Sequence, residues 1–247
     1  MKKIIPRSIH VIPRIWSNHE LKKFAHHFKG DVVNVSAWQD NDKEGRKYAN
    51  YFSNAKSYTL TNFKEEMRGF QGYSGEIFLD LEKPLPSELE GRFDAVFNHT
   101  TLEHVYDFQT AMDNLCKMTR DIAIVVVPFL QVMHGNYGDY WRFSPEAIAK
   151  MFEKRGLSVA YLSFNKQKRT SVYIFCIASK NPDKWKNIFP FKYSFEDDNE
   201  SFMPDPLAGC NALRLPLFLE FFENLFEIPR RAISKLKKII FSKTKHG

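Results

Sequence analysis

The sequence predicts an α/β fold built on a doubly wound, mostly parallel sheet of seven strands. Apolar runs of strand length alternate with helical patterns over residues 18–178, as is typical of such a sheet. The most hydrophobic run, residues 122–127, is continuous and largely β-branched, as expected in the middle of a parallel sheet. The last two runs, 157–164 and 171–178, are joined by a basic turn and predict an antiparallel pair that closes the domain.

The expected elements follow the chain in order. Residues 1–17 contain Pro6 and Pro13, so they form at best an edge strand or an arm. Asn18 can cap a first helix that ends at Gly30. The other expected elements are strands at 31–37, 57–61, 76–79 and 93–97, a strand at 122–127 that ends at Pro128, helices at 43–52 and 102–119, and a helix from Ser144 that stops at Gly156.

The net charge of +7, from 36 basic and 29 acidic residues, is concentrated near the C-terminal end. Residues 228–247 carry the whole surplus and contain no acidic residue, so residues 1–227 balance to zero. A balanced main domain gives no electrostatic reason to expect a nucleic-acid partner. The 228–247 segment predicts a basic amphipathic helix on an anionic membrane surface; the alternative is a helix that covers the domain or forms a homodimer.

We expect an α/β domain at 1–180, a proline- and aromatic-rich connecting arm at 181–206, and an apolar, then basic helical extension at 207–247. The three cysteines are widely spaced and odd in number, which predicts reduced thiols in a cytoplasmic protein. No signal peptide is expected, and no stretch reaches the roughly 18 apolar residues of a membrane span. The expected location is the cytoplasm, with peripheral attachment to the inner face of the membrane.

The segment from Gly91 to Val105 is where chemistry is expected. Its apolar run at 93–97 predicts a buried strand, and a polar turn then leads into a helical pattern. In open α/β sheets, ligands bind outside the carboxyl ends of the strands. Residues Asn98 to His104 are therefore the first candidates for a functional site.

Residues 18–180 resemble the class I S-adenosyl-L-methionine (S-adenosylmethionine)-dependent methyltransferases, which have a Rossmann-like fold. The resemblance lies in Asp80 within LDLEKPLP, the segment FDAVFNHTTLEHV, the apolar strand before Pro128, and DYWRFSPEAI before Gly156. The last segment resembles a subset associated with bacterial surface polysaccharides. The resemblance implies S-adenosylmethionine as cofactor and a hydroxyl of a cell-surface glycan or glycan precursor as methyl acceptor.

The family's glycine-rich first motif, similar to V-L-D-x-G-x-G-x-G, corresponds here to residues 32–40. Asn34 stands at its acidic position, and Ser36, Trp38 and Asp40 stand at its glycine positions. Glycine suits such a loop because the backbone passes close to the cofactor, often with positive φ. Trp38 either blocks the site or lines it differently from a glycine.

The resemblance also implies the other cofactor-binding residues. Asn62 follows the second strand, where the family tends to place an acid that holds the ribose hydroxyls. The Asp80 carboxylate is expected to accept a hydrogen bond from the adenine amine, while the Leu81 amide meets the ring. Asn98 and His99 are expected beside the cofactor at the end of the 93–97 strand; for Asp80 the alternative is a turn residue after a strand.

Transfer to a hydroxyl requires a base, and histidine suits it because its pKa lies near working pH. His134 is the first candidate, followed by His104 and His99; each has an ordinary packing role as the alternative. Residues expected to bind the acceptor are Tyr137, Asp139, Tyr140 and Arg142. The alternative is that Trp141 and Phe143 fasten this loop to the core while Arg142 pairs with an acid. No metal constellation is visible, because Asp80, Asp94 and Asp139 are scattered.

The leading functional hypothesis is therefore a methyltransferase that modifies a cell-surface glycan or its precursor. The second is a non-catalytic subunit of a polysaccharide assembly system that keeps the fold without the cofactor, which the altered glycine loop favours. Methylation of nucleic acid is disfavoured by the balanced charge of the main domain.

Overall fold

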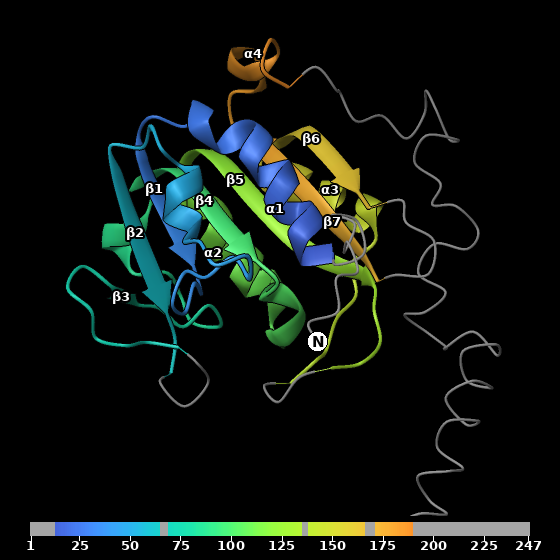
Figure 1. Ribbon diagram of the computed structural model, residues 1–247, viewed down its shortest axis with the longest axis horizontal. Coiled ribbons are helices and arrows are strands. Elements are labelled where there is room, and N and C mark those ends of the chain that lie inside the picture. The colour runs from blue at the N-terminus through green and yellow to red at the C-terminus, as the bar shows by residue number, and fades with distance from the viewer. Residues whose placement is uncertain (1–12, 65–68, 135–137, 166–170, 190–247) are drawn as a thin grey trace, which may run out of the picture.

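A computed structural model describes residues 13–64, 69–134, 138–165 and 171–189, and its centre is a seven-stranded sheet (Figure 1). The strand order is β3-β2-β1-β4-β5-β7-β6. Only β7 is antiparallel to its neighbours, β5 and β6. The predicted fold class, a mostly parallel sheet with an antiparallel C-terminal strand, is confirmed. The strands are Asp31–Val35 (β1), Ser57–Asn62 (β2), Ile77–Phe78 (β3), Phe93–His99 (β4), Thr119–Leu130 (β5), Ser158–Phe164 (β6) and Val172–Ser179 (β7).

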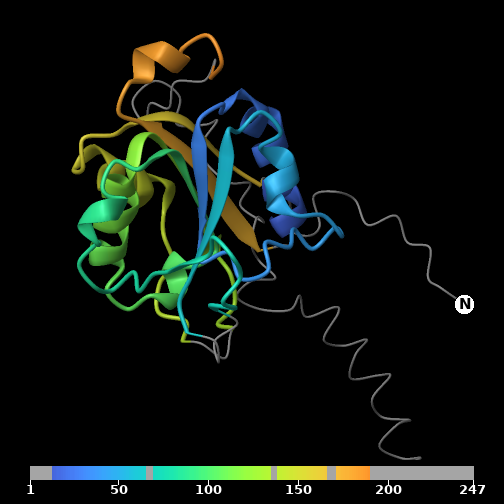
Figure 2. The same cartoon turned by 90° about the vertical axis from the view of Figure 1, so that its left-hand side faces the viewer.

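Helices cover both faces of the sheet, which Figure 2 shows nearly edge-on. Side chains alternate along each strand, so β1 sends Val32 into one apolar cluster and Val33 and Val35 into the other. The cluster around Val32 contains residues of α1 (Pro13–Phe24) and the short α4 (Pro182–Trp185). The opposite cluster contains residues of α2 (Phe108–Met118) and α3 (Pro145–Glu153). The two layers hold the sheet rigid and leave its carboxyl edge to the loops.

The first helix begins earlier than the sequence predicted. Residues 13–17 were expected in an arm or edge strand, but α1 starts at Pro13. Proline is well tolerated in the first turn of a helix, because its missing N–H has no intrahelical partner there. Trp16 and Leu21 are buried and hold this helix on the sheet. The correction matters because it carries Arg14 to the carboxyl edge.

The predicted helix over 43–52 is wrong: only Tyr48–Tyr51 forms a short 3-10 helix. The Asp42 Oδ1 atom accepts hydrogen bonds from the backbone amides of Glu44, at 2.7 Å, and Arg46, at 2.9 Å. A side chain that captures these amides competes with helix formation. Residues 41 and 47 form an antiparallel bridge instead.

The predicted helix over 102–119 is divided into a 3-10 turn, Leu102–His104, and α2. Val105 between them has an extended backbone, with φ −102° and ψ 117°. Asp107 then caps α2, because its side chain accepts from the amide of Thr110. As a result, residues 102–104 form a separate turn just after β4, at the carboxyl edge of the sheet.

Strand β5 also continues past Pro128, where the sequence predicted its end, to Leu130. The pairing with β7 shifts register between Pro128 and Leu130, and a proline is tolerated at such an irregularity. The antiparallel pair of β6 and β7 and the helix capped by Ser144 are confirmed.

Trp185 and Phe189, expected in the connecting arm, are buried in the same cluster as Val32. Residues 190–206 of that arm and the extension at 207–247 lie outside the described residues, so the expectations about membrane attachment and dimer formation stay predictions. Within the described part of the chain, no helix combines the length and apolar character needed to cross a membrane.

Candidate functional site

Strands β1, β2 and β4 end at one edge of the sheet (Figure 1). A cavity of about 940 Å³ lies at this carboxyl edge. Residues that follow these three strands and β3 form much of its wall. Parallel strands bring their carboxyl ends to one edge, which explains why segments far apart in sequence meet here. The residues singled out from the sequence that line it are Asn34, Ser36, Trp38, Asn62, Asp80, Leu81, His99, His104, His134 and Tyr140.

The loop after β1 has the backbone conformation of a glycine loop without any glycine. Ser36 has φ 58°, Trp38 has φ 47° and Asp40 has φ 61°. These are the three positions at which the resembled motif has glycine, and each lies in the left-handed region that glycine favours. The strand therefore ends at Val35 and not at Ala37 as predicted. The sequence of the motif has changed, while the path of its backbone has been kept.

Hydrogen bonds from buried side chains hold this strained loop in place. Asn62 accepts from the backbone amide of Trp38 at 2.5 Å and donates to its carbonyl at 3.1 Å. Asn34 donates to Asp40 Oδ1 at 2.8 Å. Asn62 and Asn34 are both buried. Their polar atoms thus fix the middle of the loop at Trp38 and its end at Asp40, and Trp38 is one of the residues that line the cavity.

Replacing Trp38 with glycine and with alanine separates backbone strain from the loss of the indole. Both variants lose the same side-chain contacts, but only glycine relaxes at φ 47°. We expect the glycine variant to be more stable than the alanine variant by about 1 kcal/mol. Chemical denaturation of the purified proteins measures the difference. At the neighbouring Gln39, whose φ is not positive, the order should reverse; equal stabilities of the two Trp38 variants would contradict the strain.

Asp80 lies in the turn after β3 and lines the cavity. Its Oδ1 atom accepts from the amide of Glu82 at 3.0 Å, and its carbonyl accepts from the amide of Lys83 at 3.2 Å. The buried Leu81 is held from behind, because its carbonyl accepts from Asn114 Nδ2 at 3.0 Å. Asp80 is therefore both a turn residue and a carboxylate on the cavity wall.

Asn98 and His99 end β4 and are differently placed. Asn98 is buried, is not among the lining residues, and donates to the carbonyl of Val35 at 3.0 Å. His99 lines the cavity, and its Nε2 lies 2.8 Å from Ser17 Oγ. Because the Ser17 hydroxyl donates to the carbonyl of Arg14, Nε2 donates to Ser17. Desolvation lowers the pKa of His99 well below its ordinary value, with the charge of Arg14 as a second cause.

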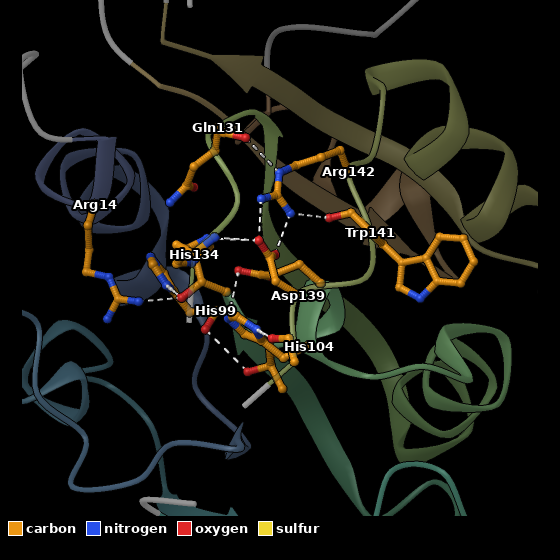
Figure 3. Close-up of polar contacts among 12 residues, drawn as sticks. Arg14, His99, His104, Gln131, His134, Asp139, Trp141 and Arg142 are labelled. Carbon is orange, nitrogen blue, oxygen red and sulfur yellow. Dashed lines mark hydrogen bonds and ion pairs between the residues drawn. The ribbon is translucent and has the colours of Figure 1, made fainter. Parts of the chain in front are cut away.

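The other His99 nitrogen is also used, since Nδ1 lies 3.1 Å from Thr100 Oγ1. Thr100 Oγ1 in turn accepts from the Arg14 guanidinium. Arg14 and His99 both line the cavity, and Figure 3 shows them near each other. His99 is therefore a link in a hydrogen-bonded chain, and its two nitrogens already have hydrogen-bond partners on the protein.

A second group contains Glu103, His104 and His134, and Figure 3 shows His104 and His134 next to each other. His104 Nδ1 donates to the carbonyl of Gly138 at 2.5 Å, which puts the lone pair of the neutral ring on Nε2. Desolvation lowers the pKa of His104, so the neutral ring is favoured. The rings of His104 and His134 meet edge to face, with centroids 5.2 Å apart. Their geometry favours either histidine over His99 as a base.

Glu103 is fully buried beside these histidines. Among the described residues, neither of its carboxylate oxygens has a hydrogen-bond partner. Desolvation raises the pKa of Glu103 to about 8. Its backbone carbonyl accepts from the amides of Tyr140 and Trp141, so the loop before α3 closes over it. A buried carboxyl group of this kind, next to a cavity, is typical of a functional site.

Asp139 and Arg142, predicted to bind the acceptor, are bound to each other. Arg142 donates from Nη1 and Nη2 to the Asp139 carboxylate at 2.6 and 2.7 Å, and neither residue is among the lining residues. Trp141 packs edge to face on Phe108 with centroids 4.7 Å apart. These contacts are those of a loop fastened to the core. Tyr140 lines the cavity and is exposed, and Tyr137 lies outside the described residues.

Sequence reasoning missed Arg14 as a cavity residue, and it gave Thr100 and Glu103 no role although both lie in the candidate segment from Asn98 to His104. Arg14 was assigned to an arm, although Pro13 before it was a signal for a helix start. Glu103 was a visible signal too, as a lone acid between Leu102 and His104 in a segment expected to pack. Lys43, Lys64 and Lys83 also line the cavity and were not singled out.

No protein-family model matches the chain, and no curated protein matches it. Among solved structures, the N-methyltransferase NodS from Bradyrhizobium japonicum is 13% identical, with 72% of this chain and 93% of that chain covered and a TM-score of 0.48. An S-adenosylmethionine-dependent methyltransferase from Mesorhizobium loti is 9% identical, with 66% and 97% covered and a TM-score of 0.47.

The 1,6-didemethyltoxoflavin-N1-methyltransferase of Burkholderia thailandensis is 12% identical, with 66% of this chain and 78% of that chain covered and a TM-score of 0.46. At these identities the similarity concerns the fold. The function proposed below is therefore based on the residues of this chain.

Proposed function

We propose that this protein transfers a methyl group from S-adenosylmethionine to a hydroxyl of a cell-surface glycan or a glycan precursor. The observation that carries the proposal is the arrangement of the cavity. Ser36, Ala37 and Trp38 of the left-handed loop line the same cavity as Asp80, His104 and His134. We call the loop and Asp80 the cofactor side and the two histidines the acceptor side; both lie at the edge where α/β proteins bind ligands.

The cofactor side fits S-adenosylmethionine in two respects. The backbone of the loop at 36–40 follows the left-handed path that glycines permit, so main-chain atoms can approach a bound nucleoside closely. Asp80 offers a carboxylate for the adenine amine, beside the backbone of Leu81. When bound, S-adenosylmethionine supplies an activated methyl group, and the protein has to hold the acceptor in line and take up its proton.

The cavity as a whole suits a sugar that carries negative charge. Tyr106 and Tyr140 meet edge to face with centroids 5.4 Å apart, and their exposed rings provide apolar surface for a sugar. Two acidic residues, Asp80 and Glu82, line the cavity. The four cationic residues that line it are Arg14, Lys43, Lys64 and Lys83. A phosphate-linked glycan precursor complements this excess of positive charge. His104 and His134 lie within the same cavity as candidates for the base.

A non-catalytic binding subunit is the second candidate, and the contacts of Asn62 favour it. Asn62 stands where a ribose-binding acid is expected, but its amide group is bonded to the Trp38 backbone and donates to Glu76. A side chain used in this way holds the loop and has less capacity to bind ribose. Loss of cofactor binding with retention of the fold is the outcome that this alternative predicts.

Calorimetric titration of the full chain with S-adenosylmethionine and S-adenosylhomocysteine tests the proposal. We expect saturable binding of both, weakened about tenfold or more by Asp80→Ala, because a charged hydrogen bond is lost. Asp183→Ala, a highly exposed position on α4, is the control and should leave binding unchanged. Absence of binding at millimolar ligand, with the protein folded, would reject the enzyme and favour the binding subunit.

A further inference from the structure

Three potential metal ligands converge on the acceptor side of the cavity. Glu103 and His104 belong to the 3-10 turn Leu102–His104, and His134 belongs to the loop after β5. Each offers one ligand atom, and these atoms lie within 4.8 Å of one another. Two independent segments of the chain therefore place an oxygen and two nitrogens around one point.

Glu103 is not satisfied by hydrogen bonds from the part of the chain that the structure describes. It is fully buried, and neither carboxylate oxygen has a hydrogen-bond partner among the described residues. His104 Nε2, 3.8 Å from Oε1, is its near contact within the cluster. Burial of a carboxyl group without a partner is costly, and native proteins usually satisfy such groups. A bound cation would coordinate one of the oxygens and neutralise the carboxylate.

One of the two histidines, His104, is oriented as metal-binding histidines usually are, and the other is held in place through its backbone. A ligating imidazole commonly has its other nitrogen against a carbonyl or a carboxylate, which fixes the ring and its tautomer. His104 Nδ1 donates to the carbonyl of Gly138 at 2.5 Å. His134 Nδ1 lies 3.5 Å from Asp139 Oδ2 without a hydrogen bond, and that carboxylate accepts from the His134 backbone amide at 2.7 Å. The His104 ring is thus fixed through Nδ1, whereas His134 is held through its backbone and keeps a buried Nδ1 that has no hydrogen-bond partner among the described residues.

We propose that Glu103, His104 and His134 form a binding site for a divalent transition-metal ion. Two imidazole nitrogens and one carboxylate oxygen suit ions such as Zn²⁺, Mn²⁺ or Fe²⁺, whereas Mg²⁺ and Ca²⁺ favour sites made of oxygen alone. Three protein ligands leave coordination positions open, and His104 and His134 line the cavity, so these positions face it.

The consequence for the reaction rests on the proposed function. A hydroxyl bound to such an ion loses its proton more readily, as metal-bound water does. His104 and His134 would then act through the ion by holding it, and the acceptor oxygen would be positioned by coordination. The proposal about the site itself, however, concerns metal binding and is tested without S-adenosylmethionine.

The test uses the full chain, treated with chelator and titrated calorimetrically with ZnCl₂ and MnCl₂. We expect one saturable site that Glu103→Gln, His104→Ala and His134→Ala each weaken at least about 100-fold. His26→Ala, which removes an exposed histidine on the amino side of β1, should leave the affinity unchanged. Titration with Co²⁺ adds a spectroscopic readout, because coordination by imidazole changes its visible absorption.

The His134→Ala variant keeps the test valid if a buried substitution disturbs folding. The His134 side chain is 35% exposed, and Asp139 holds this residue through its backbone amide, which the substitution retains. Absence of saturable binding, or equal binding by the wild type and all three ligand variants, would overturn the proposal. Metal binding without S-adenosylmethionine binding would reject only the proposed methyl transfer, so the two failures are distinguishable.

Discussion

Glu103→Gln is expected to remove most of the loss of stability that the chelator-treated protein shows between pH 5 and pH 8. Burial raises the pKa of Glu103 from its ordinary value of 4.5 to about 8. Between these values the folded protein keeps a proton that the unfolded chain releases. The free energy of unfolding therefore falls as the pH rises, and it is highest below the unfolded pKa.

The size of this pH effect on the free energy of unfolding follows from the pKa shift of Glu103. Each pKa unit corresponds to about 1.4 kcal/mol, so Glu103 alone should lower the free energy of unfolding by roughly 4 kcal/mol up to pH 8. Glutamine keeps the shape and has no charge to desolvate, so its variant should show a much flatter pH profile. Urea denaturation at pH 5, 6, 7 and 8 in the presence of chelator measures this.

Glu88→Gln is the matched control, because Glu88 is exposed in the turn Ser87–Leu89. It should retain the wild-type slope. If Glu103→Gln also retained that slope, Glu103 would be charged and satisfied in the folded protein, and its burial without a partner would be contradicted. A Zn²⁺-loaded protein should lose the slope as well, because the ion stabilises the charged carboxylate.

The sequence predicted the fold because the evidence for it is local and repeated. Apolar runs such as 122–127 predict the strands. Their alternation with helical patterns is compatible with only a few sheet topologies. The elements that were wrong depend on single side chains. The Asp42 carboxylate captures two amides and replaces the predicted helix at 43–52 by a turn. Such capture depends on a side-chain position that periodicity does not encode.

The position of the candidate site could be predicted from the sequence, but the burial and contacts of its side chains could not. The rule that ligands bind at the carboxyl edge places Ser36, Asp80 and His104 around one cavity. The environment of Glu103 depends on residues 138–142, which lie more than thirty positions away and cover it. Long-range packing decides whether an acid is exposed or buried, so its raised pKa could not be read from the sequence.

Asp139→Asn is expected to destabilise the protein by about 3 kcal/mol and to loosen the loop that carries His134. The Asp139 carboxylate, 5% exposed, accepts from Arg142 Nη1 at 2.6 Å, from Nη2 at 2.7 Å and from the His134 amide at 2.7 Å. Asparagine keeps the shape, but it removes the charge and turns one acceptor into a donor that faces the guanidinium. Breaking a buried pair in this way leaves a cation without its partner.

Acid should remove the same interaction from the wild-type protein. The hydrogen bonds from Arg142 lower the pKa of Asp139 to about 2, from an ordinary value of 3.8. The stabilisation is therefore complete above pH 4 and is lost as the pH falls towards 2, whereas the Asn variant lacks it throughout. Denaturation at pH 7 and pH 3 measures both effects, since the difference between the two proteins should shrink at the lower pH.

Two comparisons separate this pair from ordinary surface charges. Glu153→Gln removes the partner of Lys150 in a pair whose side chains are 51% and 68% exposed, and it should cost no more than about 0.5 kcal/mol. Combining Asp139→Asn with Arg142→Met should cost less than the sum of the single changes, because the guanidinium is then absent. Additive losses would mean that Asp139 acts through the His134 amide alone, and that this one backbone contact holds the acceptor wall.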